Sequence, residues 1–329
     1  MKIAILDDFQ DAVRALDCFG LLEGHDVRVF TSSARGVGQM AIRLAPFDAL
    51  VLIGERTALA RPLLSKLPRL RLIAQAGKVS GHIDISAASK HGIAIAEGIG
   101  SPVAPAELTW TLIMAATRKI VPYANNLKDG LWQTASVNPS LNGLGTVLRG
   151  RTLAVWGYGS IGRLVAGYAK AFGMHVLVWG GETRRKEAEA DGFEAASSRQ
   201  AFFERADVLT LHLRLVDATR AIVTAVDLAR MKPSALFVNT SRAELVEAGA
   251  LEAALHRGCP GAAALDVFAS EPLAPDAPLL RIPTVLATPH LGYVERDSYE
   301  LVFRAAFENV NNFASGNPSN ILNPEALYA

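Results

Sequence analysis

The residues that carry the most chemical information in this chain are an arginine, a glutamate and a histidine in its second half. Arg242, Glu271 and His290 each follow an apolar segment of strand length. An arginine holds a carboxylate through two parallel hydrogen bonds and polarises an adjoining carbonyl group. A histidine exchanges protons with oxygen near neutral pH, and a neighbouring glutamate fixes its tautomer and favours its protonated form. Each residue alone is a weak signal, but together they indicate acid–base chemistry beside an anchored carboxylate.

A glycine-rich turn lies upstream of these three residues. The segment Gly157-Tyr158-Gly159-Ser160-Ile161-Gly162 follows an apolar run and precedes a stretch with a helical pattern. In such a turn the first glycine makes a tight bend, the second lets the backbone approach a pyrophosphate, and the third lets helix and strand pack closely. The start of the helix offers unpaired N–H groups and a partial positive charge to the phosphates. This pattern predicts a dinucleotide-binding βαβ unit.

These candidate sites must be positioned by strands that alternate with helices along the chain. The strand-length apolar segments are residues 2–6, 27–30, 49–53, 72–75 and 93–96, and then 152–156, 175–179, 208–213, 235–239, 261–265 and 285–287. Continuous apolar runs suit strands buried on both faces of a parallel sheet, and alternation with helices predicts doubly wound sheets. Ligands bind beyond the carboxyl ends of such strands. A strongly apolar stretch at 106–120 predicts one long helix with Pro105 in its first turn.

Composition limits the possible classes of protein. The chain has 329 residues, 50% hydrophobic and 20% charged, with a net charge of +1, which suits two globular domains. The interspersed charges predict no nucleic-acid or membrane partner, and Asp7 and Asp8 stand where a signal peptide needs apolar residues. Cys18 and Cys259 stand alone, without metal-ligand spacing. We expect a cytoplasmic, reduced protein without a metal.

Along essentially its whole length the sequence resembles the D-isomer-specific 2-hydroxyacid dehydrogenases, a family that includes phosphoglycerate and glyoxylate/hydroxypyruvate enzymes. The resemblance rests on the glycine-rich turn and on three later motifs in the family's order: Met231-Lys232-Pro233 leading into Val238-Asn239-Thr240-Ser241-Arg242, Ala264-Leu265-Asp266-Val267-Phe268 followed by Glu271-Pro272-Leu273, and Thr288-Pro289-His290-Leu291-Gly292. It implies an α/β protein with two doubly wound domains. Residues 1–101 and 295–329 would form a flavodoxin-like substrate domain, and residues 102–294 a Rossmann NAD(P)-binding domain, with the active site in the cleft between them.

The same resemblance implies an NAD(P)-dependent oxidoreductase that acts on CH–OH groups and transfers hydride between nicotinamide C4 and substrate C2. His290 would be the acid/base, Glu271 its partner, and Arg242 the anchor of the substrate carboxylate and carbonyl. Further contacts with the cofactor are implied for residues 157–162 and for Gly180, Gly181, Glu182, His212, Leu213, Thr240, Ser241 and Asp266, the last at the nicotinamide carboxamide. Gly77, Lys78 and Val79 match the loop whose backbone N–H groups hold the substrate carboxylate. Lys78 either adds positive charge there or lies solvated on the loop surface.

The sequence departs from the family's pattern at the ribose site. A dinucleotide fold that binds NAD usually has an acidic residue after its second strand, and that position falls on Gly180. Glu182 swinging back to the ribose would give NAD, whereas Arg184 or Arg185 would admit the 2′-phosphate of NADP. The two arginines alternatively belong to a solvated helix start. We expect NAD and leave NADP open.

Three further alternatives concern function and assembly. Relatives of this fold that act as dinucleotide-sensing corepressors share the arginine, glutamate and histidine positions, so a binding protein without turnover is the runner-up to an enzyme. A formate-dehydrogenase-like enzyme would carry glutamine in place of Glu271, which argues against it. A homodimer is the family expectation, formed through the helix at 106–120 and its surroundings, unless that helix fills the core of one chain. The identity of the 2-oxo or 2-hydroxy acid substrate is open.

Overall fold

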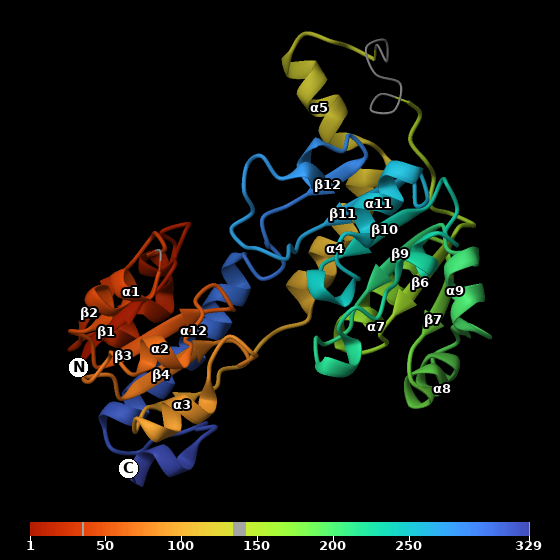
Figure 1. Ribbon diagram of the computed structural model, residues 1–329. Coiled ribbons are helices and arrows are strands. Elements are labelled where there is room, and N and C mark those ends of the chain that lie inside the picture. Colours follow the sequence, from red (N-terminus) through yellow and green to blue (C-terminus); the bar gives the residue numbers. More distant parts are fainter. Residues whose placement is uncertain (35, 134–142, 329) are drawn as a thin grey trace. The chain divides into compact units, whose positions relative to one another are not determined.

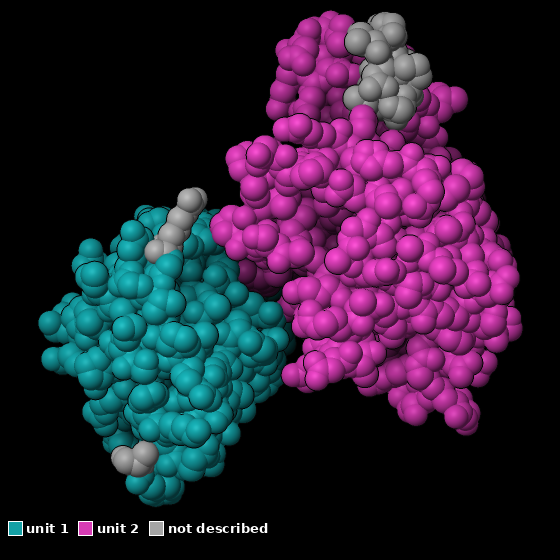
Figure 2. Space-filling view, in the orientation of Figure 1, with its two compact units in different colours: residues 1–101, 294–329 teal, residues 102–293 magenta. Residues whose placement is uncertain are grey.

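The computed structural model describes residues 1–34, 36–133 and 143–328, and the chain divides into two compact units. Unit 1 comprises Met1–Ser101 and Val294–Ala329, and unit 2 comprises Pro102–Tyr293 (Figure 2). Each unit contains one parallel sheet with helices, which confirms the predicted fold class of two doubly wound α/β domains. Within the described ranges, no helix combines the length and apolar character needed to cross a bilayer.

Unit 1 is built on a five-stranded sheet with the order β2-β1-β3-β4-β5 (Figure 1). Its strands are β1 (Lys2–Ile5), β2 (Asp26–Val29), β3 (Ala49–Ile53), β4 (Leu72–Ala76) and β5 (Ala94–Ala96). Its helices are η1 (Val13–Ala15), η2 (Asp17–Leu22), α1 (Val37–Leu44), α2 (Arg61–Leu64), α3 (Ile85–Lys90), α12 (Arg296–Ala314) and η6 (Pro324–Tyr328). Every residue of β3 and β4 is buried, which explains why both strands are apolar except at Gln75.

The C-terminal segment is tied to unit 1 by side-chain hydrogen bonds. The Glu300 carboxylate on α12 accepts hydrogen bonds from the backbone amides of Asp17 and Cys18 at the start of η2. The Asn323 side chain accepts a hydrogen bond of 2.7 Å from the backbone amide of Ile95 in β5. Hydrophobic periodicity alone did not assign this segment to either half of the chain, and these contacts do.

Unit 2 is built on a seven-stranded sheet with the order β12-β11-β10-β9-β6-β7-β8. Its strands are β6 (Thr152–Trp156), β7 (His175–Trp179), β8 (Glu194–Ala195), β9 (Val208–Leu211), β10 (Leu236–Asn239), β11 (Ala262–Leu265) and β12 (Val285–Ala287). Its helices are α4 (Val103–Thr117), α5 (Ile120–Lys128), α7 (Ser160–Ala171), α8 (Glu182–Ala190), α9 (Arg199–Arg205), α10 (Ala225–Leu228), α11 (Ala250–Arg257), η3 (Asp217–Thr219), η4 (Ala243–Leu245) and η5 (Pro278–Arg281). The strand order reverses between β6 and β9, and nucleotides bind at such a switch point.

The apolar stretch predicted as one helix at 106–120 is divided in the structure. The helix α4 ends at Thr117 and α5 begins at Ile120, because Lys119 adopts a left-handed backbone with φ of 53°. Pro105 lies in the first turn of α4, as predicted. Leu112 and Ile113 are buried in the core of unit 2, so α4 fills that core with part of its surface.

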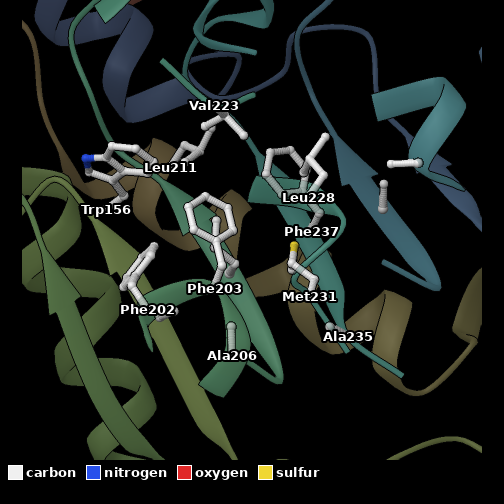
Figure 3. Close-up of a cluster of buried hydrophobic side chains, with 14 of the residues drawn as sticks. Trp156, Phe202, Phe203, Ala206, Leu211, Val223, Leu228, Met231, Ala235 and Phe237 are labelled. Atoms are coloured by element: carbon white, nitrogen blue, oxygen red, sulfur yellow. The ribbon is translucent and has the colours of Figure 1, made fainter. Parts of the chain in front are cut away.

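The core of unit 2 lies on both faces of its sheet. Along β6, Ala154 and Trp156 belong to one buried cluster, and Leu153 and Val155 belong to a second. Figure 3 shows the first cluster, in which Trp156 meets Phe202 and Phe203 edge to face with ring centroids 6.0 and 5.8 Å apart. Successive side chains of a strand point to opposite faces, so the four buried positions of β6, from Leu153 to Trp156, are all apolar.

Two glycines of the turn after β6 are required by close packing. A Cβ atom on Gly157 would lie 2.3 Å from the carbonyl oxygen of His212, and Gly157 has a φ of 104°. A Cβ atom on Gly162 would lie 2.1 Å from the carbonyl oxygen of Gly157. Both contacts are with backbone atoms, which cannot move aside as a flexible side chain can. The helix α7 therefore approaches β6 only because these positions lack side chains.

We predict that Gly162→Ala destabilises unit 2 by about 1–3 kcal/mol, because the added methyl group overpacks a backbone contact. The matched control is Gly167→Ala on the same helix, where a Cβ atom meets nothing within 4 Å. That change should be neutral or stabilise the helix by up to about 1 kcal/mol. Thermal unfolding followed by calorimetry tests the pair, and equal midpoints for the two variants would contradict the packing argument.

Candidate active site

His290 and Glu271 form a close pair in unit 2. The Nδ1 atom of His290 lies 2.6 Å from Oε2 of Glu271, and the other carboxylate oxygen accepts a hydrogen bond of 2.9 Å from the backbone amide of Phe268. Burial raises the pKa of the Glu271 carboxyl, but the hydrogen bond and charge of His290, the Phe268 amide and the charge of Arg242 together hold that pKa below its usual value. Glu271 is therefore an anion that orients the imidazole through Nδ1.

The loop that carries His290 is held by Asp266, which is fully buried at the end of β11. One carboxylate oxygen of Asp266 accepts hydrogen bonds from the Thr288 hydroxyl at 2.6 Å and the Leu291 amide at 2.8 Å. The other accepts from the Gly292 amide at 2.9 Å. Between these anchors His290 has a left-handed backbone with φ of 54°. Burial raises the pKa of Asp266 even though these hydrogen bonds favour its charged form. The side chain predicted to contact a carboxamide thus holds the histidine loop.

Arg242 is positioned by a turn at the end of β10. The side chain of Asn239 donates a hydrogen bond of 2.9 Å to the Arg242 carbonyl and accepts one of 3.0 Å from the Ser241 amide. The Ser241 hydroxyl donates to the carbonyl of Leu211 at 2.6 Å, which fixes the turn to β9. The Arg242 guanidinium donates to the Ser241 carbonyl at 2.6 Å. Asn239 and Ser241 therefore set the direction of the arginine.

Neighbouring strands bring the three predicted residues to one edge of the unit 2 sheet. The strand β10 pairs with β11, and β11 pairs with β12, all in parallel, so that their carboxyl ends lie side by side (Figure 1). Arg242, Glu271 and His290 follow these ends in that order. The charge of Arg242 also contributes to the lowered pKa of Glu271. The arrangement supplies a cation and an imidazole–carboxylate pair at a common edge.

The glycine-rich turn leaves room for a ligand at the start of α7. Gly159 is the N-cap residue of this helix, makes no side-chain cap, and would meet no atom within 4 Å if it carried a Cβ atom. Ser160 and Ile161 begin the helix, so their amides face outward without a side-chain partner at the cap. Tyr158 instead turns inward and donates a hydrogen bond of 2.7 Å to Asp191. The backbone of this turn fits a pyrophosphate, whereas the tyrosine side chain supports the core.

Two further predicted cofactor residues, His212 and Leu213, border this turn, and a third, Thr240, contacts α4. His212 follows β9, and burial lowers its pKa to about 3, so its imidazole is neutral. Its Nε2 atom lies 3.0 Å from the hydroxyl oxygen of Thr210. The side chain of Leu213 lies 3.1 Å from the Cβ position of Gly157. The Thr240 hydroxyl lies 2.7 Å from the Thr109 hydroxyl on α4. The turn therefore has neutral groups, those of His212 and Leu213, beside Gly157.

At the ribose position the structure shows where the acidic candidate lies. Gly180 and Gly181 follow β7, and the Glu182 carboxylate pairs with Lys186 one turn further along α8, at 2.7 Å. The Glu182 side chain is 72% exposed. It therefore points along the helix surface in this structure.

In unit 1, the predicted substrate loop contains an ion pair that sequence reasoning missed. The Nζ atom of Lys78 lies 2.8 Å from Oε2 of Glu97, and the Val79 amide donates a hydrogen bond of 3.0 Å to Oε1 of the same carboxylate. Neither alternative given for Lys78 describes it fully, because its positive charge is paired with the Glu97 carboxylate. Glu97 directly follows β5, and the strand-end rule applied to the first half of the chain would have found it.

Comparison with known proteins agrees with this geometry. Residues 110–292 match the family model described as "D-isomer specific 2-hydroxyacid dehydrogenase, NAD binding domain". A glyoxylate reductase from Aeropyrum pernix is 38% identical over 269 residues, which cover 80% of each chain. A D-3-phosphoglycerate dehydrogenase from Methanocaldococcus jannaschii is 33% identical over 96% of this chain, which spans 58% of that enzyme's length. A crystal structure described as a putative D-3-phosphoglycerate dehydrogenase from Ralstonia solanacearum is 54% identical, with a TM-score of 0.96 over 99% of this chain and 98% of its own.

The chain belongs to the D-isomer-specific 2-hydroxyacid dehydrogenase family. It is an NAD-dependent oxidoreductase that acts on CH–OH groups, as the sequence resemblance predicted. No group of metal-ligating side chains that would hold a metal ion occurs among the residues that the structure describes.

The lowered pKa of Glu271 predicts a pH-dependent contribution to stability. Because its folded pKa lies below the ordinary value of 4.5, the charged carboxylate stabilises the fold above pH 4.5. That contribution is lost as the pH falls through the lowered folded pKa. Glu271→Gln should therefore melt below the unchanged protein at pH 6, and the difference should shrink steadily toward pH 3. Calorimetric midpoints across this range test it, and a pH-independent difference would contradict the charge-based origin.

Proposed function

We propose that this protein interconverts a small 2-oxo acid and its D-2-hydroxy acid, with His290 as the acid/base, Glu271 as its support and Arg242 as the substrate anchor. The observation that carries the proposal is the 2.6 Å contact between His290 and Glu271 on a loop held by the buried Asp266. A structural histidine needs no carboxylate at Nδ1 and no strained loop at a ligand-binding edge.

In the reductive direction the residues of unit 2 have distinct tasks. Arg242 holds the substrate through its planar guanidinium and stabilises negative charge as it develops on the carbonyl oxygen, a contribution of about 3 kcal/mol for one donor. Glu271 engages Nδ1 of His290, which leaves Nε2 to deliver a proton to the forming alkoxide. A nicotinamide dinucleotide held at the glycine-rich turn would supply the hydride for this reduction. The backbone at Gly159 and the first turn of α7 hold its pyrophosphate.

Unit 1 is proposed as the substrate domain, with the Gly77–Val79 loop contributing backbone donors. Glu97 balances the charge of Lys78 and also accepts the Val79 amide, so the loop offers a substrate carboxylate the amides of Gly77 and Lys78 rather than a net positive charge. Arg242 is then the cation that pairs with the carboxylate. Glyoxylate and other small 2-oxo acids suit a site with one cation, Arg242, and backbone donors. Their carboxylate and adjoining carbonyl match the guanidinium fork.

We also propose that two copies of the chain associate through α5 and the end of α4. The helix α5 buries none of its residues, and it exposes apolar side chains at Ile120 (54%), Val121 (41%) and Leu127 (56%). Trp132, which follows it, is 70% exposed. Exposed apolar side chains clustered on one helix favour a protein interface, and a second copy is the occupant proposed here.

The direct test of the reaction is oxidation of NADH and NADPH with glyoxylate, hydroxypyruvate, pyruvate, phenylpyruvate and 2-oxoglutarate. His290→Ala should lower turnover about 100- to 10,000-fold, because the proton donor is lost. Its affinity for the reduced cofactor, measured by fluorescence titration, should remain unchanged. Turnover close to that of the unchanged protein would reject the acid/base role.

The matched control is His256→Ala, which removes an exposed histidine from the end of α11 and should leave turnover intact. Arg242→Lys keeps the charge but loses the planar fork, so it should raise the KM for the 2-oxo acid. If no acid in the panel turns over while a dinucleotide still binds, either the substrate lies outside the panel or the protein binds the cofactor without using it.

The dimer proposal predicts a mass of twice 35.1 kDa in sedimentation at micromolar concentration. Leu127→Lys should shift the protein toward the monomer, because a charge would be buried in the apolar contact. Ile42→Lys is the control, since Ile42 is an exposed apolar residue of unit 1 at 81%. A monomer at micromolar concentration before any substitution would remove the proposal.

A further inference from the structure

Glu97 holds the Gly77–Val79 loop of unit 1 by two contacts. One oxygen of its carboxylate accepts a hydrogen bond of 3.0 Å from the Val79 amide, and the other lies 2.8 Å from the Nζ atom of Lys78. The Glu97 side chain is 23% exposed, whereas that of Lys78 is 65% exposed. One mostly buried carboxylate therefore engages a backbone donor and the positive charge of the proposed substrate loop.

The backbone around Glu97 keeps this carboxylate beside the loop. The Asn309 side chain on α12 donates a hydrogen bond of 3.1 Å to the Glu97 carbonyl. The next residue, Gly98, donates its amide to the Gly77 carbonyl at 2.9 Å. A Cβ atom on Gly98 would lie 2.5 Å from the Gln75 carbonyl oxygen, so the close approach of the two segments requires glycine. The position of Glu97 is thus set by α12 and by the end of β4.

A second cation at the same edge of the unit 1 sheet is also engaged within the unit. Arg56 follows β3, the neighbour of β4. Its guanidinium donates to the Asp7 carbonyl at 2.7 Å and to the Tyr299 hydroxyl at 3.1 Å, and its Cζ atom lies 4.9 Å from the centroid of the Phe9 ring. Arg56 is thus directed to groups of unit 1, and the charge of Lys78 is cancelled by a carboxylate.

We propose that Glu97 is a specificity-determining residue that restricts the substrates of this chain to acids with one anionic group. The proposal rests on the proposed function, in which the Gly77–Val79 loop receives the substrate carboxylate. An uncancelled Lys78 ammonium beside that loop would attract every anionic substrate, and the Coulomb energy would be about twice as large for a dianion as for a monoanion.

Glu97 removes this advantage of the dianion. A second carboxylate or a phosphate ester must still lose part of its hydration on binding, and with Lys78 cancelled no cation of the loop offsets that loss. An acid whose single carboxylate is held by backbone amides does not meet this cost. The ion pair therefore favours monoanionic 2-oxo and 2-hydroxy acids by electrostatics, whatever the shape of the side chain.

The test compares two pairs of acids that differ in one anionic group. They are 2-oxovalerate and 2-oxoglutarate, reduced with NADH, and D-glycerate and D-3-phosphoglycerate, oxidised with NAD. An acid that does not turn over is measured as a competitive inhibitor of the best acid in the reduction panel. In the unchanged protein the monoanion of each pair should have the larger kcat/KM or the smaller inhibition constant.

Glu97→Gln keeps an acceptor for the Val79 amide but releases Lys78. The dianion should then gain about tenfold in kcat/KM relative to the monoanion, chiefly through KM, and added potassium chloride should reduce the gain. The double variant Glu97→Gln/Lys78→Met should lose the gain, because the released cation is absent. Lys78→Met alone should shift the ratio further toward the monoanion, and it tests the proposal even where Glu97→Gln does not fold.

Asp48→Asn is the matched control in unit 1. Asp48 likewise accepts a hydrogen bond from a backbone amide, that of Lys2 at 2.8 Å, and pairs with a cation, Arg69 at 3.0 Å. It directly precedes β3 and so lies at the opposite edge of the sheet from the loop. Its substitution should leave the ratio of dianion to monoanion unchanged.

The outcomes separate this inference from the proposed function. A ratio that stays the same in Glu97→Gln, or a gain that persists in the double variant, would overturn the role of Glu97. An unchanged protein that prefers the dianion of either pair would overturn the substrate class while leaving the reaction established. If no acid of the pairs or of the panel turns over, the proposed function fails together with this inference.

Discussion

The candidate catalytic edge depends on one buried carboxylate, that of Asp266. A buried carboxylate without partners would cost several kcal/mol, so its environment must supply donors. The Thr288 hydroxyl and the amides of Leu291 and Gly292 supply them. Because these donors stand on both sides of His290, the loop cannot relax without leaving the carboxylate unpaired. The left-handed backbone of His290, which costs about 1–2 kcal/mol in an L-residue, is retained for this reason.

Sheet register explains why the loop meets its partners. In the parallel register Asn239 is opposite Leu265, and Leu265 is opposite Ala287, so β10, β11 and β12 end at the same level. Residues a short distance beyond these three positions must then lie near one another. These residues are far apart in the sequence, but the strands that precede them are neighbours in the sheet, about 4.8 Å apart. The sheet thereby brings Arg242, Glu271 and His290 to one edge although they are far apart in the sequence.

The strands of unit 2 were predictable because their signals are local, and the same signals led to the candidate site residues beyond their ends. A strand segment buried on both faces is apolar throughout, as β6 is from Leu153 to Trp156, and polar residues beyond such strands are easily recognised in the sequence. The short β8 was missed, since two residues give no periodic signal. The break between α4 and α5 was missed because it depends on the left-handed backbone of Lys119. Lysine rarely adopts this conformation, so a lysine in the sequence gives no sign of a helix break. Partners from distant segments, such as Asp191 for Tyr158, are fixed by tertiary packing and have no local signature.

Residue type alone also failed to show which cations are available to a ligand. Lys78 attracted attention because it lies in the substrate loop, yet β4 and β5 are neighbours and bring Glu97 to it. Arg184 and Arg185 are equivalent in sequence, but a helix turns successive side chains by about 100°, so that only Arg184 reaches Glu187 along the helix surface. Arg185 turns toward β7 and lies on Trp179 instead. Whether a cation is neutralised is thus decided by the strand order and by the phase of the helix. Both are properties of the fold, and they explain why Lys78 of unit 1 pairs with a carboxylate whereas Arg185 of unit 2 lies over an aromatic ring.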